Sequence, residues 1–315
     1  MIAAAAVQKP KALGQGSRFA VIAPASPGKS DRVAAGQREL QRLGFSVTPP
    51  ESLPPDGYFA SSADARHSEF LKALANPASN AVIATRGGYG SVYVLEQGLP
   101  KSLPLKPLIG FSDITTLQIY LWQKHRWTGF YGPMLAAGLD HGAGAPGGYD
   151  ELSFRSAVTK TSGAWTIPLQ GEILQPGSAE GLVLGGATTL LEATLGTPWE
   201  LDTDGAILIL EDRAMKPYQI DRVLMHLKHA GKLSKIRGLV LGDFPDCEPP
   251  VAGSPSVRDV CARILAPLGI PIIFGAPIGH TARSILTVPL GVRARLNAEG
   301  SGTLEILEPA VIAND

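Results

Sequence analysis

The 315-residue sequence has little of several features that would define a class of protein. It contains only 2 cysteines, Cys247 and Cys261, which form no CxxC pair and have no histidine beside them. A disulfide framework or a structural zinc site is therefore not expected. It also lacks an excess of charge of either sign, with 28 basic and 28 acidic side chains. This balance excludes the positive footprint of a nucleic-acid-binding protein.

Long apolar runs are missing as well. No stretch approaches the roughly 20 apolar residues of a membrane-spanning helix. The apolar start of the chain is short and has no basic residues before it, so it does not fit a signal peptide. With 44% hydrophobic and 18% charged residues, the composition is that of a folded globular protein. We expect a cytoplasmic protein without nucleic acid or membrane as partner, and a frayed leader over residues 1–16.

Glycine and proline, in contrast, are abundant, with 36 and 26 residues, and they indicate many tight turns between short elements. In the first half of the chain, short apolar runs alternate with amphipathic stretches of helical length. The predicted strands cover residues 19–23, 45–48, 81–85 and 107–111, and the predicted helices 31–43, 64–75 and 114–122. This alternation predicts a Rossmann-like domain with a parallel sheet over residues 17–161.

The second half has a mixed pattern. Residues 162–179 are polar and interrupted by glycine and proline, so we interpret them as a linker. Strands are predicted at 206–210, 238–242 and 271–275, helices at 187–195, 217–230 and 257–268, and a closing hairpin over 286–296 and 303–307. These elements predict a C-terminal mixed α/β domain over residues 180–315 and an α/β fold class for the chain.

Ser112 lies at the turn between a predicted strand and the helix 114–122. In a parallel sheet this turn is at the carboxyl end of the strand, where ligands bind. A sharp turn exposes the hydroxyl, and the N–H groups at the start of the helix can hold an oxyanion. The segment has only the first glycine of the G-x-S-x-G pattern. Simple capping of the helix by Ser112 or Asp113 is therefore the alternative.

A second glycine-rich turn, Arg86-Gly-Gly-Tyr-Gly90, follows the strand 81–85. It matches neither the dinucleotide fingerprint nor the P-loop. Its glycines permit close backbone approach and the positive φ angles of an anion-binding nest. The arginine beside them favours a carboxylate or an oxyanion as ligand, and a plain tight turn is the alternative.

A serine nucleophile needs a base and a group that orients the base. Of the 6 histidines, His280 follows a predicted strand and so shares the topological position of Ser112. Glu211 and Asp212 end the strand 206–210, and either carboxylate can orient the imidazole. For both acids, helix capping or pairing with Arg213 is the alternative.

Five segments taken together resemble the LD-carboxypeptidases, a family of serine peptidases that also holds the microcin-immunity peptidases. The segments are Arg86-Gly-Gly-Tyr-Gly90, Gly110-Phe-Ser-Asp-Ile-Thr115, Gly132-Pro133, Leu210-Glu-Asp212 with Tyr218-x-Ile-Asp-Arg222, and Pro277-Ile-Gly-His280. The resemblance covers residues 18–309 and implies a catalytic triad of Ser112, Glu211 and His280, with Glu211 chosen over Asp212.

The resemblance also implies further site residues. The oxyanion hole would consist of the backbone N–H groups of Asp113 and Gly88, and Arg86, Gly87 and Tyr89 would bind substrate. It implies a homodimer that uses neither a metal nor another cofactor and acts on a small peptide.

The implied reaction is removal of the terminal D-Ala from a murein tetrapeptide, across an L–D peptide bond, during cell-wall recycling. Two other functions remain open from the sequence. One is a microcin-immunity-type amidase that cleaves a peptidyl-nucleotide antibiotic, and the other is a non-catalytic peptide-binding protein on the same scaffold. A pocket with cations for carboxylates favours the murein peptide, whereas an aromatic side chain placed to stack on a base favours the antibiotic.

Overall fold

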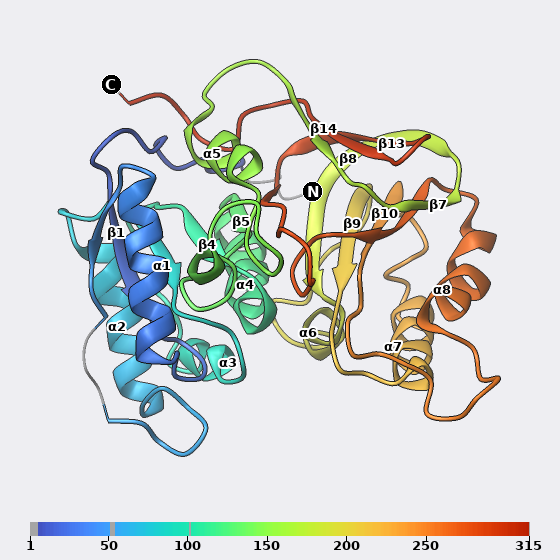
Figure 1. The fold of residues 1–315 in the computed structure, drawn as a ribbon, viewed down its shortest axis with the longest axis horizontal. Coiled ribbons are helices and arrows are strands. Elements are labelled where there is room, and N and C mark those ends of the chain that lie inside the picture. Colours follow the sequence, from blue (N-terminus) through green and yellow to red (C-terminus); the bar gives the residue numbers. More distant parts are fainter. Residues whose placement is uncertain (1–5, 51–53, 101, 315) are drawn as a thin grey trace.

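The computed structural model describes residues 6–50, 54–100 and 102–314. Two β-sheets lie side by side, each with helices packed on it (Figure 1). This architecture confirms the α/β fold class. Within the described residues, no helix is both long enough and apolar enough to cross a membrane.

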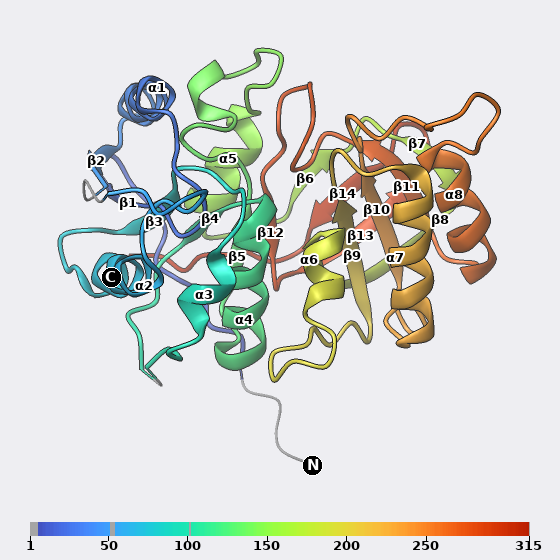
Figure 2. The same cartoon turned by 90° about the horizontal axis from the view of Figure 1, so that it is seen from below.

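The first sheet has the strand order β12-β5-β4-β3-β1-β2. Neighbours among β1 to β5 pair in parallel, and β12 pairs antiparallel with β5. Figure 2 shows α1 and α5 on one face of this sheet and α2, α3 and α4 on the other. The elements are β1 (Arg18–Ile22), α1 (Ser30–Arg42), β2 (Ser46–Thr48), α2 (Ala63–Ala75), β3 (Ala81–Ala84), α3 (Ser91–Leu95), β4 (Leu108–Gly110), α4 (Thr115–His125), β5 (Gly129–Tyr131), α5 (Glu151–Thr159) and β12 (Val288–Leu290).

The second sheet has the order β6-β14-β13-β8-β9-β10-β11-β7. Its centre, β8 to β11, is parallel, and the strands on both flanks are antiparallel. Its elements are β6 (Trp165–Pro168), β7 (Glu172–Gln175), β8 (Gly177–Ala187), α6 (Thr188–Ala193), β9 (Ala206–Glu211), α7 (Pro217–His229), β10 (Gly238–Gly242), α8 (Val257–Leu265), β11 (Ile272–Ala276), β13 (Arg293–Ala298) and β14 (Thr303–Ile306). All residues of β9 and β10 are buried, as expected for central parallel strands covered on both faces.

Residues 162–179 are not a linker. They contain β6 and β7, which form the two opposite edges of the second sheet, and they include the start of β8. Edge strands keep one side in water and therefore carry polar residues, as the partly exposed β7 does. The polar composition that suggested a linker reflects this position at the sheet edges.

The expected frayed leader is wrong for residues 8–13. The Ala12 amide donates to the Ile312 carbonyl (2.8 Å) and the Leu13 amide to the Val158 carbonyl (2.8 Å). The side chain of Leu13 is buried. The partners are more than a hundred residues away in the sequence, so no local pattern could reveal them. Residues 1–5 of the predicted leader lie outside the described part of the chain.

The C-terminal part of the chain contributes strands to both sheets. β13 and β14 form the predicted antiparallel hairpin, whereas β12 crosses back to the first sheet and pairs with β5. Cys247 and Cys261 are both buried and free.

Candidate active site

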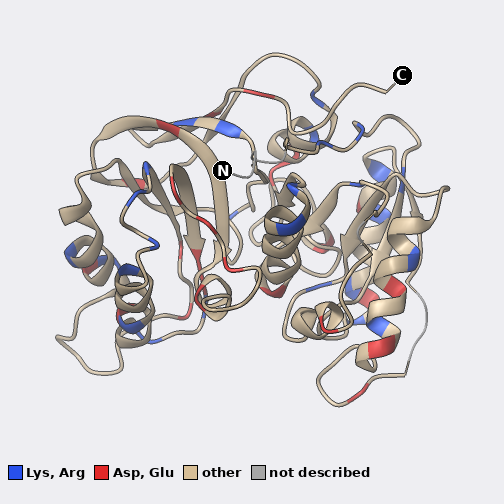
Figure 3. Ribbon diagram, turned by 180° about the vertical axis from the view of Figure 1, so that it is seen from behind, with Lys and Arg blue, Asp and Glu red and all other residues tan. Residues whose placement is uncertain are grey.

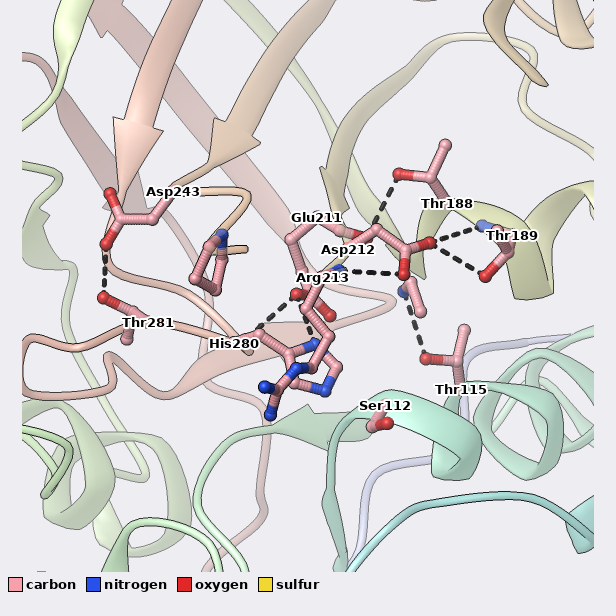
Figure 4. A network of polar contacts seen from close by, with 12 residues as sticks. Ser112, Thr115, Thr188, Thr189, Glu211, Asp212, Arg213, Asp243, His280 and Thr281 are labelled. Carbon is pink, nitrogen blue, oxygen red and sulfur yellow. Dashed lines mark hydrogen bonds and ion pairs between the residues drawn. The ribbon is translucent and has the colours of Figure 1, made fainter. Parts of the chain in front are cut away.

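The carboxyl ends of strands from both sheets meet at one pocket of about 430 Å³. Ser112 follows β4 and the turn 86–90 follows β3, both in the first sheet. Glu211 is the last residue of β9, and His280 lies in the loop after β11, both in the second sheet. Figure 4 shows the His280 ring between Glu211 and Ser112. The fold thus brings together three residues that are up to 168 positions apart in the sequence (280 − 112).

Ser112 sits on a strained turn. Its φ angle is +62°, in the left-handed region that non-glycine residues seldom adopt. A 3-10 turn, η1 (Ser112–Ile114), follows directly and leads into α4. Gly87 approaches so closely that a Cβ atom there would stand 2.7 Å from Ser112 Oγ. The sharp turn and the adjacent glycine together present the hydroxyl to the pocket.

Glu211 is fully buried and holds His280 at two points. Its Oε2 accepts hydrogen bonds from the backbone N of His280 (2.9 Å) and from the ring Nδ1 (2.8 Å). Because Nδ1 carries the proton in this arrangement, Nε2 is left as the acceptor. Ser112 and His280 line the same pocket, and no direct hydrogen bond joins these two described side chains. Hydrogen bonds between catalytic groups are often long or poorly aligned before a substrate binds.

The loop that carries His280 is shaped by its neighbours. Gly279 has a φ of +60°, and a Cβ atom there would stand 2.4 Å from Cδ of Glu211. The Phe111 ring packs edge-on against the imidazole, with centroids 5.1 Å apart. Thr281 donates a hydrogen bond to Asp243, the residue after β10. These contacts fix both the backbone and the ring of His280.

Asp212 has different hydrogen-bond partners from Glu211. Its Oδ2 accepts hydrogen bonds from the backbone N (2.9 Å) and Oγ1 (2.8 Å) of Thr189, at the start of α6. Its Oδ1 accepts from the Arg213 amide (3.0 Å). Burial raises the pKa of Asp212. Of the two neighbouring acids, only Glu211 contacts His280, as Figure 4 shows.

The two predicted oxyanion donors lie in the turns that follow β4 and β3. The Asp113 amide follows Ser112, and Gly88, with a φ of +110°, belongs to the glycine turn. The Asp113 carboxylate accepts a hydrogen bond from the Ser91 amide (2.7 Å), which ties the nucleophile turn to the start of α3. Burial raises the pKa of Asp113. On its other side the glycine turn rests on Ser26, whose amide donates to the Gly87 carbonyl (3.3 Å).

The predicted substrate-binding residues do not all reach the pocket. Arg86 and Gly87 line it. Tyr89 is not among its lining residues and is 47% exposed. The Tyr89 ring instead packs against Tyr58 and Phe59, with centroids 6.1 and 5.9 Å apart.

Sequence reasoning missed several polar residues of the pocket, namely Lys29, Arg32, His141, Arg213 and Asp246. Arg32 and Arg213 each pair with an aspartate, the second at 2.6 Å. Lys29 and Arg86 have no carboxylate partner in the part of the chain that is described. No motif could have found these side chains, because they come from loops and a helix end that only the fold brings together.

Tyr131, the last residue of β5, was also missed. Its hydroxyl donates to Glu211 Oε1 (2.5 Å) and accepts from the Ser112 amide (3.4 Å). The only signal in the sequence was its position directly before Gly132-Pro133. The three-residue strand that carries it has no recognisable period.

A serine on a strained strand-to-helix turn, with a histidine oriented by a buried carboxylate, is the arrangement of a serine hydrolase. Comparison with known families agrees with this class. The model of the LD-carboxypeptidase N-terminal domain matches residues 19–132, and that of the C-terminal domain matches residues 180–296. The chain therefore belongs to the LD-carboxypeptidase family of peptidases.

Relatives in sequence and structure fit this assignment. The chain is 36% identical over 304 residues to a probable murein peptide carboxypeptidase of Bacillus subtilis, covering 94% of each chain. A muramoyltetrapeptide carboxypeptidase from Oxalobacter formigenes has a similar structure, with a TM-score of 0.81, 27% identity, and 93% of this chain and 99% of that chain covered. Microcin C7 self-immunity protein MccF, solved with aspartyl sulfamoyl adenosine, shares the fold, with a TM-score of 0.87, 23% identity and coverage of 96% and 99%.

Proposed function

We propose that the chain is a serine-type LD-carboxypeptidase that releases the terminal D-Ala from murein tetrapeptide. The observation that carries the proposal is the hydrogen bond between His280 Nδ1 and the buried Glu211, which leaves Nε2 free in the pocket of Ser112. This is the geometry of a general base that has been oriented for a hydroxyl nucleophile.

In the proposed mechanism, Ser112 Oγ attacks the carbonyl carbon of the scissile L–D bond while His280 Nε2 takes its proton. The backbone N–H groups of Asp113 and Gly88 stabilise the oxyanion of the tetrahedral intermediate. His280 then gives the proton to the leaving amine, and D-Ala departs. Water hydrolyses the ester on Ser112 by the same route, again with His280 as base and then as acid.

The charge of the pocket supports a peptide that carries carboxylates. The cations of Lys29 and Arg86 line it without a carboxylate partner among the described residues. Phe111 is the one Phe, Tyr or Trp among the described lining residues, and its ring packs edge-on against His280. The described lining residues thus offer cations, and they include no Phe, Tyr or Trp ring apart from Phe111 on which a base could stack. This contrast favours murein peptide over a peptidyl nucleotide.

A substrate comparison tests the proposal. Murein tetrapeptide and a processed microcin are incubated separately with the protein, and the products are identified by mass spectrometry. We expect free D-Ala and the tripeptide from the first and little change in the second. Cleavage of the microcin alone would support the immunity-type amidase instead, and binding of tetrapeptide without cleavage would support the non-catalytic scaffold.

A further inference from the structure

Tyr131 connects the two halves of the site, and nothing in the triad mechanism assigns it a role. It ends β5 in the first sheet and is fully buried. Its hydroxyl donates to Oε1 of Glu211, which ends β9 in the second sheet (2.5 Å). The same oxygen accepts the amide hydrogen of Ser112 (3.4 Å). One hydroxyl therefore contacts both the orienting acid and the backbone of the nucleophile.

The hydrogen bonds of Glu211 show why this contact matters. A carboxylate buried completely needs donors at both oxygens. His280 supplies two donors, both to Oε2, and Tyr131 supplies the donor to Oε1. With both oxygens occupied, rotation of the carboxylate would break these bonds. Oε2 is thereby kept directed at the imidazole.

The phenol is suited to donate throughout the working range of a peptidase. Burial, followed by the charge of Glu211, raises the pKa of Tyr131 well above its ordinary value. The ring is confined as well, because Gly186 at the end of β8 is so close that a Cβ atom there would stand 3.0 Å from Cε2 of Tyr131. A protonated, immobile hydroxyl is what a positioning role requires.

Resting on the proposed serine chemistry of this site, we propose that Tyr131 is a positioning residue. It fixes the Glu211 carboxylate toward His280 and supports the strained Ser112 turn, so that base and nucleophile are held in one arrangement across the two sheets.

The test compares Tyr131→Phe with Tyr149→Phe. Tyr149 is a matched control because it is also fully buried and donates its hydroxyl to a glutamate, Glu39 (2.8 Å), outside the triad. The readout is the rate at which a fluorophosphonate labels Ser112 between pH 5 and 9, which requires no peptide substrate. We expect Tyr131→Phe to lower the maximal rate by about 10- to 100-fold. The acid limb of the profile of labelling rate against pH should move to higher pH, because the Glu211–His280 pair then holds its proton more tightly.

Tyr149→Phe is expected to change neither the maximal labelling rate nor the pH at the midpoint of the acid limb. Equal effects in both variants, or a wild-type profile for Tyr131→Phe, would overturn the proposal.

If Tyr131→Phe does not fold, 3-fluorotyrosine placed at position 131 keeps the shape and gives a stronger donor. The acid limb should then move to lower pH, and an unmoved limb would contradict the proposal. Wild-type protein that is labelled but leaves murein tetrapeptide intact would refute the substrate alone, whereas failure to label at all would refute both.

Discussion

Ser112 carries a conformational cost that a residue chosen for stability would avoid. Its φ of +62° places Cβ close to the following carbonyl, which costs an L-residue about 1–2 kcal/mol. Strain of this kind persists where the surrounding structure fixes the backbone, and it is concentrated at functional sites. Here β4 on one side and α4 on the other fix the turn. The strained backbone is therefore consistent with the role proposed for the Ser112 hydroxyl.

A pair of substitutions separates this strain from catalysis. Ser112→Ala and Ser112→Gly both remove the proposed nucleophile, but only glycine relieves the positive φ. We expect the glycine variant to have the higher free energy of unfolding, by about 1 kcal/mol, after the larger entropy of glycine in the unfolded chain is subtracted. Urea denaturation measures the difference. An alanine variant as stable as the glycine variant would argue against a strained turn.

At the scale of elements, the site depends on how closely the turn after β3 approaches the turn after β4. Gly87 faces Ser112, where a Cβ atom would lie 2.7 Å from both Cβ and Oγ of the serine. The backbone of Gly87 has no positive φ, so alanine can adopt its conformation. The requirement for glycine at this position is therefore one of space.

Gly87→Ala should accordingly displace Ser112, the proposed nucleophile, while leaving the fold intact. We expect a fall in kcat of about 10²-fold, as is typical when a reacting group is moved by about 1 Å. Gly129→Ala is the control, since its Cβ would have its nearest neighbour, Gln118, at an ordinary 3.5 Å. Steady-state kinetics and melting temperatures of the two variants provide the comparison. Full activity of Gly87→Ala would show that the turns have room to separate.

The strands and the site residues differ in how far the sequence could predict them. The central strands β3, β9 and β10 were predicted nearly to the residue, because buried parallel strands are continuous apolar runs. The short edge strands β6 and β7 were interpreted as a linker, since a polar, half-exposed edge has no such run. Ser112, Glu211 and His280 could be proposed because each follows a predicted strand. Tyr131 could not, because its contact with Glu211 depends on the packing of two sheets.

In the molecule as a whole, the two halves of the chain both contribute to the first sheet and both contribute residues to the site. β12, from the second half of the chain, completes the first sheet, and the residues around the pocket come from both sheets. Charges of both signs are interspersed along the ribbon, as Figure 3 shows, and the formal net charge is zero. Attraction of the anionic peptide that we propose as substrate must then come from local cations such as Lys29 and Arg86, not from the field of the entire protein. The homodimer implied by the family resemblance stays a prediction.

We propose that Ser112, with His280 as base and Glu211 orienting the imidazole, cleaves the terminal L–D bond of murein tetrapeptide. The most direct measurement is the rate of D-Ala release from purified tetrapeptide by the wild-type protein and by Ser112→Ala, both confirmed as folded. We predict steady release by the wild type and a rate lower by about 10³-fold or more for the variant. Comparable release by the two proteins, or none by the wild type, would contradict this role of Ser112.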